Sequence, residues 1–165
     1  MDKIADVITI TSSPRSFDLP AVVSAAIFAL RACGFLPKRR AVVLSVSCVS
    51  AIEMRRLNRK YRGKNSPTDV LSFEQTHSET PKLPLFLGDL VLCTDVVRRQ
   101  AKEHRHVVRI EAGILTVHGL LHLLGYDHEK STAAEAKMRK AELKVLKKIG
   151  IVTGTGLIAR AAVKS

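Results

Sequence analysis

The segment HGLLHLLGYDH, from His118 to His128, constrains the fold more than any other part of the chain. Its first two histidines lie within an apolar run, residues 114–124, that is long enough to form a buried helix. Histidines four residues apart share one face of a helix. Gly125 follows this run and is able to take a positive φ. We therefore expect the chain to leave the helix there and to bring His128 back toward the same face.

Three imidazoles that converge on one point are typical of a metal site. Three neutral nitrogen ligands leave a fourth tetrahedral position for water, as in catalytic rather than structural zinc sites. We predict one Zn²⁺ per chain, held by His118, His122 and His128. The same spacing occurs in a class of metallopeptidases, but these carry a glutamate after the first histidine as the general base, and that position is Gly119 here. The alternative is that the histidines are ordinary buried or surface residues.

The pattern of apolar and turn-forming residues predicts an α+β fold. Segments rich in β-branched residues are predicted to be strands over 3–11, 41–49, 70–74 and 85–93. Helical periodicity predicts helices over 19–33, 51–61 and 95–124, and a last helix from Ser131 or Thr132 to Gly150. Thirty residues are long for one globular helix, so we expect a break near Val107 and Val108. That break would give about five helices.

The chain of 165 residues fits a single domain over 1–165, with a loosely held tail after Gly154. A short loop between the strands 70–74 and 85–93 favours an antiparallel pair, which would make a sheet of about four strands mixed. The metal site would lie at the end of a buried helix.

The helix predicted over 51–61 has a strongly basic face. Ser50 is expected to cap it, with Glu53 as the partner in a capping box. Its apolar residues Ile52, Met54 and Leu57 are expected to be buried. Its basic residues are Arg55, Arg56, Arg59, Lys60, Arg62 and Lys64. Such runs of charge usually face water.

Two further interpretations concern the region after the fourth strand. Asp95 or Thr94 is expected to cap the helix that begins there. His104 and His106 are two residues apart and cannot share a helical face, so plain exposure is one assignment for them. His77, in a polar loop, is interpreted as a solvent-exposed residue.

Charge favours a polyanionic partner. The chain has 27 lysines and arginines against 15 acidic residues, a formal net charge of +12, with a pI near 10.1. Such a field attracts nucleic acids. Aromatic residues make up only 4% and there is no tryptophan, which favours contacts to the nucleic-acid backbone over base stacking.

The three cysteines, Cys33, Cys48 and Cys93, lack the spacing of a metal or redox pair and are interpreted as reduced core residues. The N-terminal residues do not have the pattern of a secretion signal, and no run of about 18 apolar residues indicates membrane insertion. A cytoplasmic location is therefore expected, with no membrane partner and no small-molecule cofactor.

HGLLHLLGYDH resembles the signature of the YbeY family of bacterial rRNA maturation factors, which are zinc-dependent endoribonucleases. Two more segments support this resemblance. YRGKNSPTDVLSFE, residues 61–74, is similar to the family's YRxxxxPTDVLSFP segment, and LGDLVLC, residues 87–93, resembles its LGDIxI strand. The three motifs occur in the family's order and together span about residues 57–130. Glu74 stands where the family usually has proline.

The resemblance implies a single-strand-specific, metal-dependent endoribonuclease. Its roles would be rRNA maturation, including 3′ end processing of small-subunit rRNA, and ribosome quality control, with ribosomal particles as partners. Arg62 matches the family's arginine, which would hold a phosphodiester beside the metal and stabilise charge on phosphorus. Arg62 and His118 are thus the predicted catalytic residues, and the predicted RNA contacts are Arg55, Arg59, Arg62 and Lys64. The alternative to plain exposure for His104 and His106 is likewise RNA contact.

The general base remains open. The candidates are the side chains of Asp69, Asp89 and Asp127, a metal hydroxide alone, or the 2′-hydroxyl of the RNA itself. Asp127 is alternatively a residue that fixes the orientation of an imidazole. Two other functions are kept as alternatives. One is a non-catalytic, zinc-containing module that binds RNA or the ribosome, and the other is a metallopeptidase.

Overall fold

The computed structural model describes residues 5–75, 80 and 82–151, and its four strands form one mixed sheet. The strands are β1 (Val7–Thr11), β2 (Val42–Val49), β3 (Val70–Glu74) and β4 (Leu85–Cys93), in the order β1-β2-β4-β3. β1, β2 and β4 are parallel, and β3 is antiparallel to β4. The predicted mixed sheet and its antiparallel pair are confirmed.

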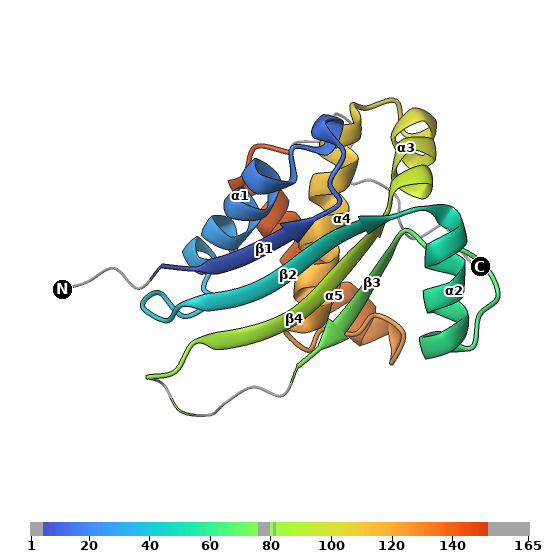
Figure 1. Cartoon of the computed structure of the whole chain (residues 1–165). Helices are drawn as coiled ribbons and strands as arrows, with labels where there is room; N and C mark the ends of the chain where they lie inside the picture. The colour runs from blue at the N-terminus through green and yellow to red at the C-terminus, as the bar shows by residue number, and fades with distance from the viewer. Residues whose placement is uncertain (1–4, 76–79, 81, 152–165) are drawn as a thin grey trace.

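Five α-helices and one short 3₁₀ helix accompany the sheet. They are η1 (Arg15–Phe17), α1 (Leu19–Ala32), α2 (Ala51–Arg62), α3 (Thr94–Glu103), α4 (Val108–Leu123) and α5 (Thr132–Lys148). The expected break separates α3 from α4. α1, α4 and α5 lie behind the sheet, whereas α2 lies beside β3 and α3 lies above α2 (Figure 1).

The alternation of side chains along β4 divides the core in two. Leu87, Leu90 and Leu92 point toward α1, α4 and α5 in the larger cluster, while Val91 and Cys93 pack in a smaller cluster with Met54 of α2. Because β4 is covered on both faces over this stretch, it reads as a nearly continuous apolar run. α4 is buried along almost its whole length. This burial confirms the prediction of a buried helix that carries His118 and His122.

The predicted burial of Ile52 is wrong. Its side chain is 84% exposed, whereas Met54 is fully buried and Leu57 is partly buried. The reason is geometric, because residues two apart on a helix point about 200° apart. The predicted cap is confirmed: Ser50 Oγ accepts a hydrogen bond from the Glu53 N–H at 3.3 Å.

The predicted cap of α3 is also wrong. α3 begins at Thr94 and its N-cap residue, Cys93, makes no side-chain cap bond. Asp95 instead accepts a hydrogen bond from the backbone N–H of Ala51 at 2.7 Å. A carboxylate is favoured there because it meets an unpaired N–H at the positive end of α2. Asp95 therefore ties α3 to the start of α2.

The interpretation of His104 and His106 is correct only in part, because His104 is exposed whereas His106 is mostly buried. Both lie in the turn after α3 and their rings meet the buried carboxylate of Glu111. His77 and the tail after Gly154 lie outside the described residues, as do residues 3 and 4 of the predicted first strand.

The cysteines are free thiols, as predicted. Cys48 and Cys93 are buried and Cys33 is half-buried. Burial raises the pKa of Cys48 to about 11, so this thiol is unreactive at neutral pH. Among the described residues, no helix has both the length and the apolarity needed to cross a bilayer.

Candidate metal centre

The end of α4 brings the three predicted histidines together. His118 and His122 lie in the last turns of the helix, and Gly125 ends it with a φ of +84°. The Gly125 N–H donates to the carbonyl of His122, and the Tyr126 N–H donates to that of Leu121. This pair of bonds is a Schellman motif, which reverses the chain after the helix. The predicted role of Gly125 is confirmed.

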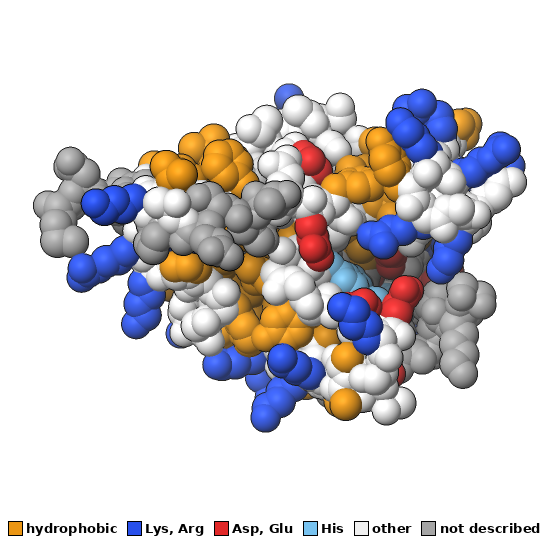
Figure 2. Space-filling model, turned by 90° about the horizontal axis from the view of Figure 1, so that it is seen from below, with side chains coloured by type: hydrophobic (Ala, Val, Ile, Leu, Met, Phe, Trp, Pro, Cys, Tyr) orange, Lys and Arg blue, Asp and Glu red, His pale blue; other side chains and the backbone are white. Residues whose placement is uncertain are grey.

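The three imidazoles form a compact cluster. Their ring centroids are 4.7, 5.2 and 5.0 Å apart, and their candidate ligand nitrogens all lie within 4.8 Å of one another. The Nε2 atoms of His118 and His122 are 3.1 Å apart. Seen from below, histidine side chains lie recessed between acidic and basic ones (Figure 2).

Glu142, which the sequence reasoning missed, orients the first of these rings. Its carboxylate contacts Nδ1 of His118, and both side chains are mostly buried. A carboxylate on one ring nitrogen fixes the imidazole so that the other nitrogen points to a metal. The available signal was an acidic residue beside the buried positions Met138, Ala141 and Val145 of α5.

The cluster fits a divalent metal ion. His128 Nδ1 is buried and has no hydrogen-bond partner among the described residues. Burial, together with the neighbouring His118 and His128, lowers the pKa of His122 to about 4. His122 is therefore neutral at pH 7, which is the form that binds metal. Three imidazoles, with no fourth protein ligand grouped beside them in the described part of the chain, suit an open zinc site.

Arg62 reaches the same region through β3. Its Nη2 donates to the backbone carbonyl of Ser72 at 3.3 Å. The Ser72 hydroxyl donates in turn to the carbonyl of Gly119 at 3.2 Å. Two hydrogen bonds therefore connect Arg62 to the turn of α4 that carries His118.

The surroundings of Gly119 oppose the metallopeptidase alternative. A Cβ atom at this position would lie 2.1 Å from Leu90 Cδ1, 3.2 Å from Ser72 Oγ and 3.3 Å from Val70 Cγ2. Position 119 therefore faces the sheet and not the histidines. A glutamate there would collide with the core instead of serving as a base.

The three candidate carboxylates are not equivalent. Asp69 accepts hydrogen bonds from its neighbours and, at 3.1 Å, from Gln100 Nε2 of α3. Asp89 is on the same face of β4 as Val91, which is opposite α4, and Gln75 Nε2 lies 3.5 Å from it. Asp127 lies close enough to His122 and His128 to interact with them electrostatically.

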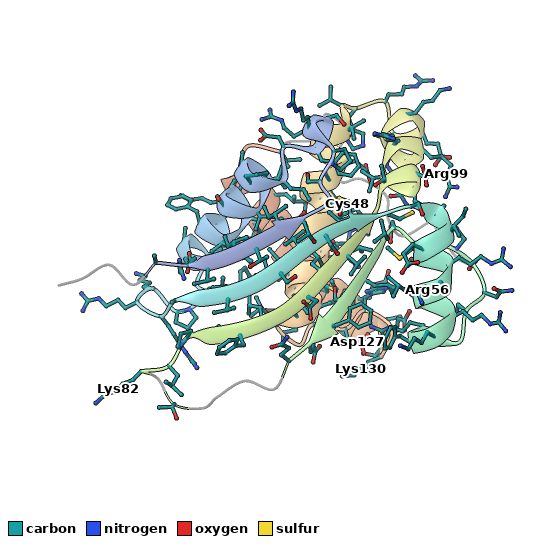
Figure 3. The ribbon with its side chains drawn as sticks, in the orientation of Figure 1. Cys48, Arg56, Lys82, Arg99, Asp127 and Lys130 are labelled. Carbon is teal, nitrogen blue, oxygen red and sulfur yellow. The ribbon has the colours of Figure 1, made fainter. Side chains whose placement is uncertain are left out.

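Asp127 is itself held by local contacts. It accepts a hydrogen bond from the Glu129 N–H at 2.9 Å and lies 3.7 Å from Lys130 Nζ. Figure 3 places Asp127 and Lys130 close together below the sheet. The hydrogen bond from Glu129 lowers the pKa of Asp127 against the opposing effect of desolvation, and the charge of Lys130 adds a smaller lowering. Asp127 is therefore ionised at neutral pH.

The predicted RNA contacts Arg55, Arg59 and Lys64 are exposed on α2 and the turn that follows it. Arg55 Nε donates to Asn65 Oδ1 at 3.0 Å. Arg56, which is labelled on the same helix in Figure 3, pairs instead with Glu53. These exposed basic side chains therefore lie on the same helix as Arg62 or in the turn just after it.

Comparison with known proteins gives one consistent result. A family model described as Endoribonuclease YbeY matches residues 15–150. Over 104 residues the chain is 47% identical to the endoribonuclease YbeY of Chloroflexus aggregans, which covers 60% of this chain and 68% of that protein. For the Roseiflexus castenholzii protein of the same name, the identity is 43% over 114 residues, covering 67% and 72%.

Two further similarities extend beyond these bacterial sequences. The chloroplastic endoribonuclease YBEY of Arabidopsis thaliana is 46% identical over 121 residues, which are 73% of this chain and 20% of that protein. The solution structure of TM1509 from Thermotoga maritima aligns with a TM-score of 0.55 and 24% identity, covering 92% of this chain and all of that one. The structural similarity supports the fold.

Proposed function

The chain belongs to the endoribonuclease YbeY family, and we propose that it is a zinc-dependent endoribonuclease that cleaves single-stranded RNA. The family match confirms the resemblance that the three sequence motifs indicated. The observation that carries the proposal is the convergence of His118, His122 and His128, with Glu142 behind His118 and Arg62 linked to the same turn.

Each residue of the centre has a distinct role. The three histidines would hold a zinc ion, which would supply Lewis-acid polarisation of a phosphoryl oxygen. Glu142 keeps His118 in the tautomer whose Nε2 is the ligand. Arg62 presents its exposed guanidinium to the phosphodiester. Among the described residues only the Ser72 carbonyl accepts from it, so most of its five N–H donors remain for the substrate.

Asp127 is the carboxylate that we propose as the proton acceptor. It is ionised and lies beside His122 and His128, whereas Asp69 and Asp89 are bonded elsewhere. Its role would be to accept the proton of the attacking water molecule. If the 2′-hydroxyl of the RNA is the nucleophile instead, its proton would go to the same carboxylate.

The preference for single strands is implied by the family resemblance, and the charge near Arg62 supports contact with the RNA backbone. Arg55 and Arg59 are exposed on α2, which ends at Arg62, and Lys64 is exposed in the turn that follows it. Spaced cations of this kind bind phosphates without reading bases. We propose rRNA, at the 3′ end of the small-subunit molecule, as the substrate, and ribosomal particles as the setting of maturation and quality control.

The test is cleavage of one labelled RNA in two forms, single-stranded and annealed to its complement. The proposal predicts cuts in the single strand alone, abolished by a chelator and restored by Zn²⁺. Unfolded casein is included as a third substrate, and its chelator-sensitive cleavage would revive the metallopeptidase. Binding of the single strand without any cleavage at full metal loading would instead favour the non-catalytic RNA-binding module.

A further inference from the structure

A second group of metal-ligating side chains lies at the opposite end of α4. Glu111 is in the first turn of this helix and is completely buried. His104 and His106 precede the helix, and Arg105 between them has a φ of +57°. Glycine is the residue that usually adopts such a positive φ, because a side chain is strained there, yet this position is an arginine. The turn places both histidines against one carboxylate.

The contacts are close and converge on one oxygen. Glu111 Oε2 lies 3.1 Å from His104 Nδ1 and 2.9 Å from His106 Nε2. The two rings stack, with centroids 5.4 Å apart and an interplanar angle of 26°. The His106 side chain is 15% exposed and the His104 side chain 28%. One atom from each residue lies within 4.8 Å of the other two.

Hydrogen bonding alone leaves this cluster incomplete. Glu111 Oε1 is buried without a partner among the described residues, and neither ring nitrogen of His106 makes a hydrogen bond of good geometry there. Among the described residues, the basic side chains in contact with Glu111 are the two histidines, which carry a positive charge only when protonated. Buried polar atoms are nearly always satisfied, and a buried carboxylate that stays ionised needs a positive charge beside it.

We infer that His104, His106 and Glu111 form a second binding site for a divalent transition metal such as Zn²⁺. Two histidines and one glutamate are a known zinc ligand set. Ligands at about 2.1 Å from a tetrahedral ion are roughly 3.4 Å apart. The observed separations of 2.9 and 3.1 Å fall a few tenths of an ångström short of that. Small side-chain movements would admit the ion, which supplies the missing positive charge.

The candidate site borders a cavity at the surface. His106 lines this cavity of about 770 Å³, which lies between η1, α3 and the start of α4. Four of the nine other lining residues are basic, namely Arg15, Arg98, Lys102 and Arg109, and Asp18 lines it as well. An ion bound beside this cavity is reached from outside without unfolding of α4.

This site is separate from the proposed catalytic centre. Glu111 and His118 are seven residues apart on one helix, which is about 10 Å along its axis. Two metals that share one substrate phosphate lie only about 4 Å apart. The second ion therefore has a structural role, in which it fixes the α3–α4 turn against the first turn of α4. It raises the expected number of ions per chain from one to two.

The test is metal stoichiometry of the full-length chain, stripped with a chelator and titrated with Zn²⁺ in a calorimeter. Wild type is expected to bind two ions, and His104→Ala, His106→Ala and His118→Ala one each. His104→Ala/His118→Ala is expected to bind neither tightly. Lys102→Ala, which changes a cationic neighbour that is not a ligand, is expected to keep both ions.

A second measurement separates ligand loss from misfolding. The metal-free His104→Ala protein is expected to have the circular dichroism and Tm of metal-free wild type, because its side chain is partly exposed. Added Zn²⁺ is expected to raise the Tm of His118→Ala but not that of His104→Ala/His118→Ala. If His104→Ala binds as many ions as wild type, the second site does not exist, whatever His118→Ala shows. If His118→Ala alone retains the wild-type number, the first site fails and the second stands.

Discussion

The carboxylate of Glu142 on α5 contacts the Nδ1 atom of His118 on α4, although the two residues are 24 positions apart in the sequence. Glu142→Gln keeps the shape of this contact but removes its charge. Such changes beside a metal ligand typically reduce metal affinity about 10- to 100-fold. We expect a loss of that size in Zn²⁺ affinity, measured by competition with a chromophoric chelator.

The matched control is Glu135→Gln, because Glu135 is an exposed residue of the same helix. It is expected to leave Zn²⁺ affinity unchanged. An equal loss of affinity in both variants would mean that charge on α5, and not the contact with His118, is responsible.

Arg62 is predicted to act on the substrate and not on the metal. Arg62→Ala removes charge stabilisation at the reacting phosphate and is expected to slow RNA cleavage about 10²- to 10³-fold. Metal content is expected to stay at the wild-type level. Arg56→Ala, on the same helix, removes a cation already paired with Glu53 and is expected to cleave at nearly the wild-type rate. Loss of metal in Arg62→Ala would contradict this division of roles.

Gly88 is predicted to be essential for the sheet. Its φ is +126°, and a Cβ atom there would lie 2.0 Å from the backbone carbonyl oxygen of Phe73 on the neighbouring strand. Gly88→Ala is expected to lower the free energy of unfolding by roughly 3 kcal/mol or more. Gly34 has a φ of +83° but open space around it, so Gly34→Ala should cost only about 1 kcal/mol. Urea unfolding of both variants measures how much free energy of unfolding each one loses. Equal losses would show that the close approach of the Phe73 carbonyl is not the cause.

The pair of Asp6 and Arg31 is predicted to make stability depend on pH. Partial burial alone would raise the pKa of Asp6, but hydrogen bonds from Arg31 and the Val42 N–H, with the charge of Arg31, hold it below the usual 3.8. Because the pKa is lowered on folding, the stabilisation is complete above pH 3.8 and is lost as the pH falls through the folded value.

Asp6→Asn is therefore expected to cost about 1 kcal/mol at pH 7 and progressively less below pH 3.8. Urea unfolding at a series of pH values measures this. Glu103→Gln, which changes an exposed carboxylate, serves as the control. A cost of Asp6→Asn that persists unchanged in acid would show that packing, and not the ion pair, is what the substitution removes.

Local patterns were enough to predict most of the fold. The apolar run before Gly125 predicted both a buried helix and its end, because helix termination depends on the φ of one residue. The cap at Ser50 and the break before Val108 were also predictable, because each depends on residues that are neighbours in the sequence. The three histidines could be grouped because they lie within eleven residues of one helix and its turn.

Other features depend on elements that are distant in the sequence. Asp95 could cap its own helix, but the unpaired Ala51 N–H lies near it only after folding. Glu142 meets His118 because α5 packs on α4, which no spacing reveals. The convergence of His104 and His106 requires a positive φ at Arg105, a residue type that rarely adopts one. The error at Ile52 was avoidable, since its angle from Met54 already placed it on another face.

The most direct test of the central claim is to measure RNA cleavage and metal content on the same samples of wild type and His118→Ala. The account predicts that wild type holds zinc and cuts a labelled single-stranded RNA, while His118→Ala has lost both the ion bound at this centre and the activity. Cleavage by His118→Ala at the wild-type rate would contradict the assignment of the three-histidine cluster as the catalytic centre.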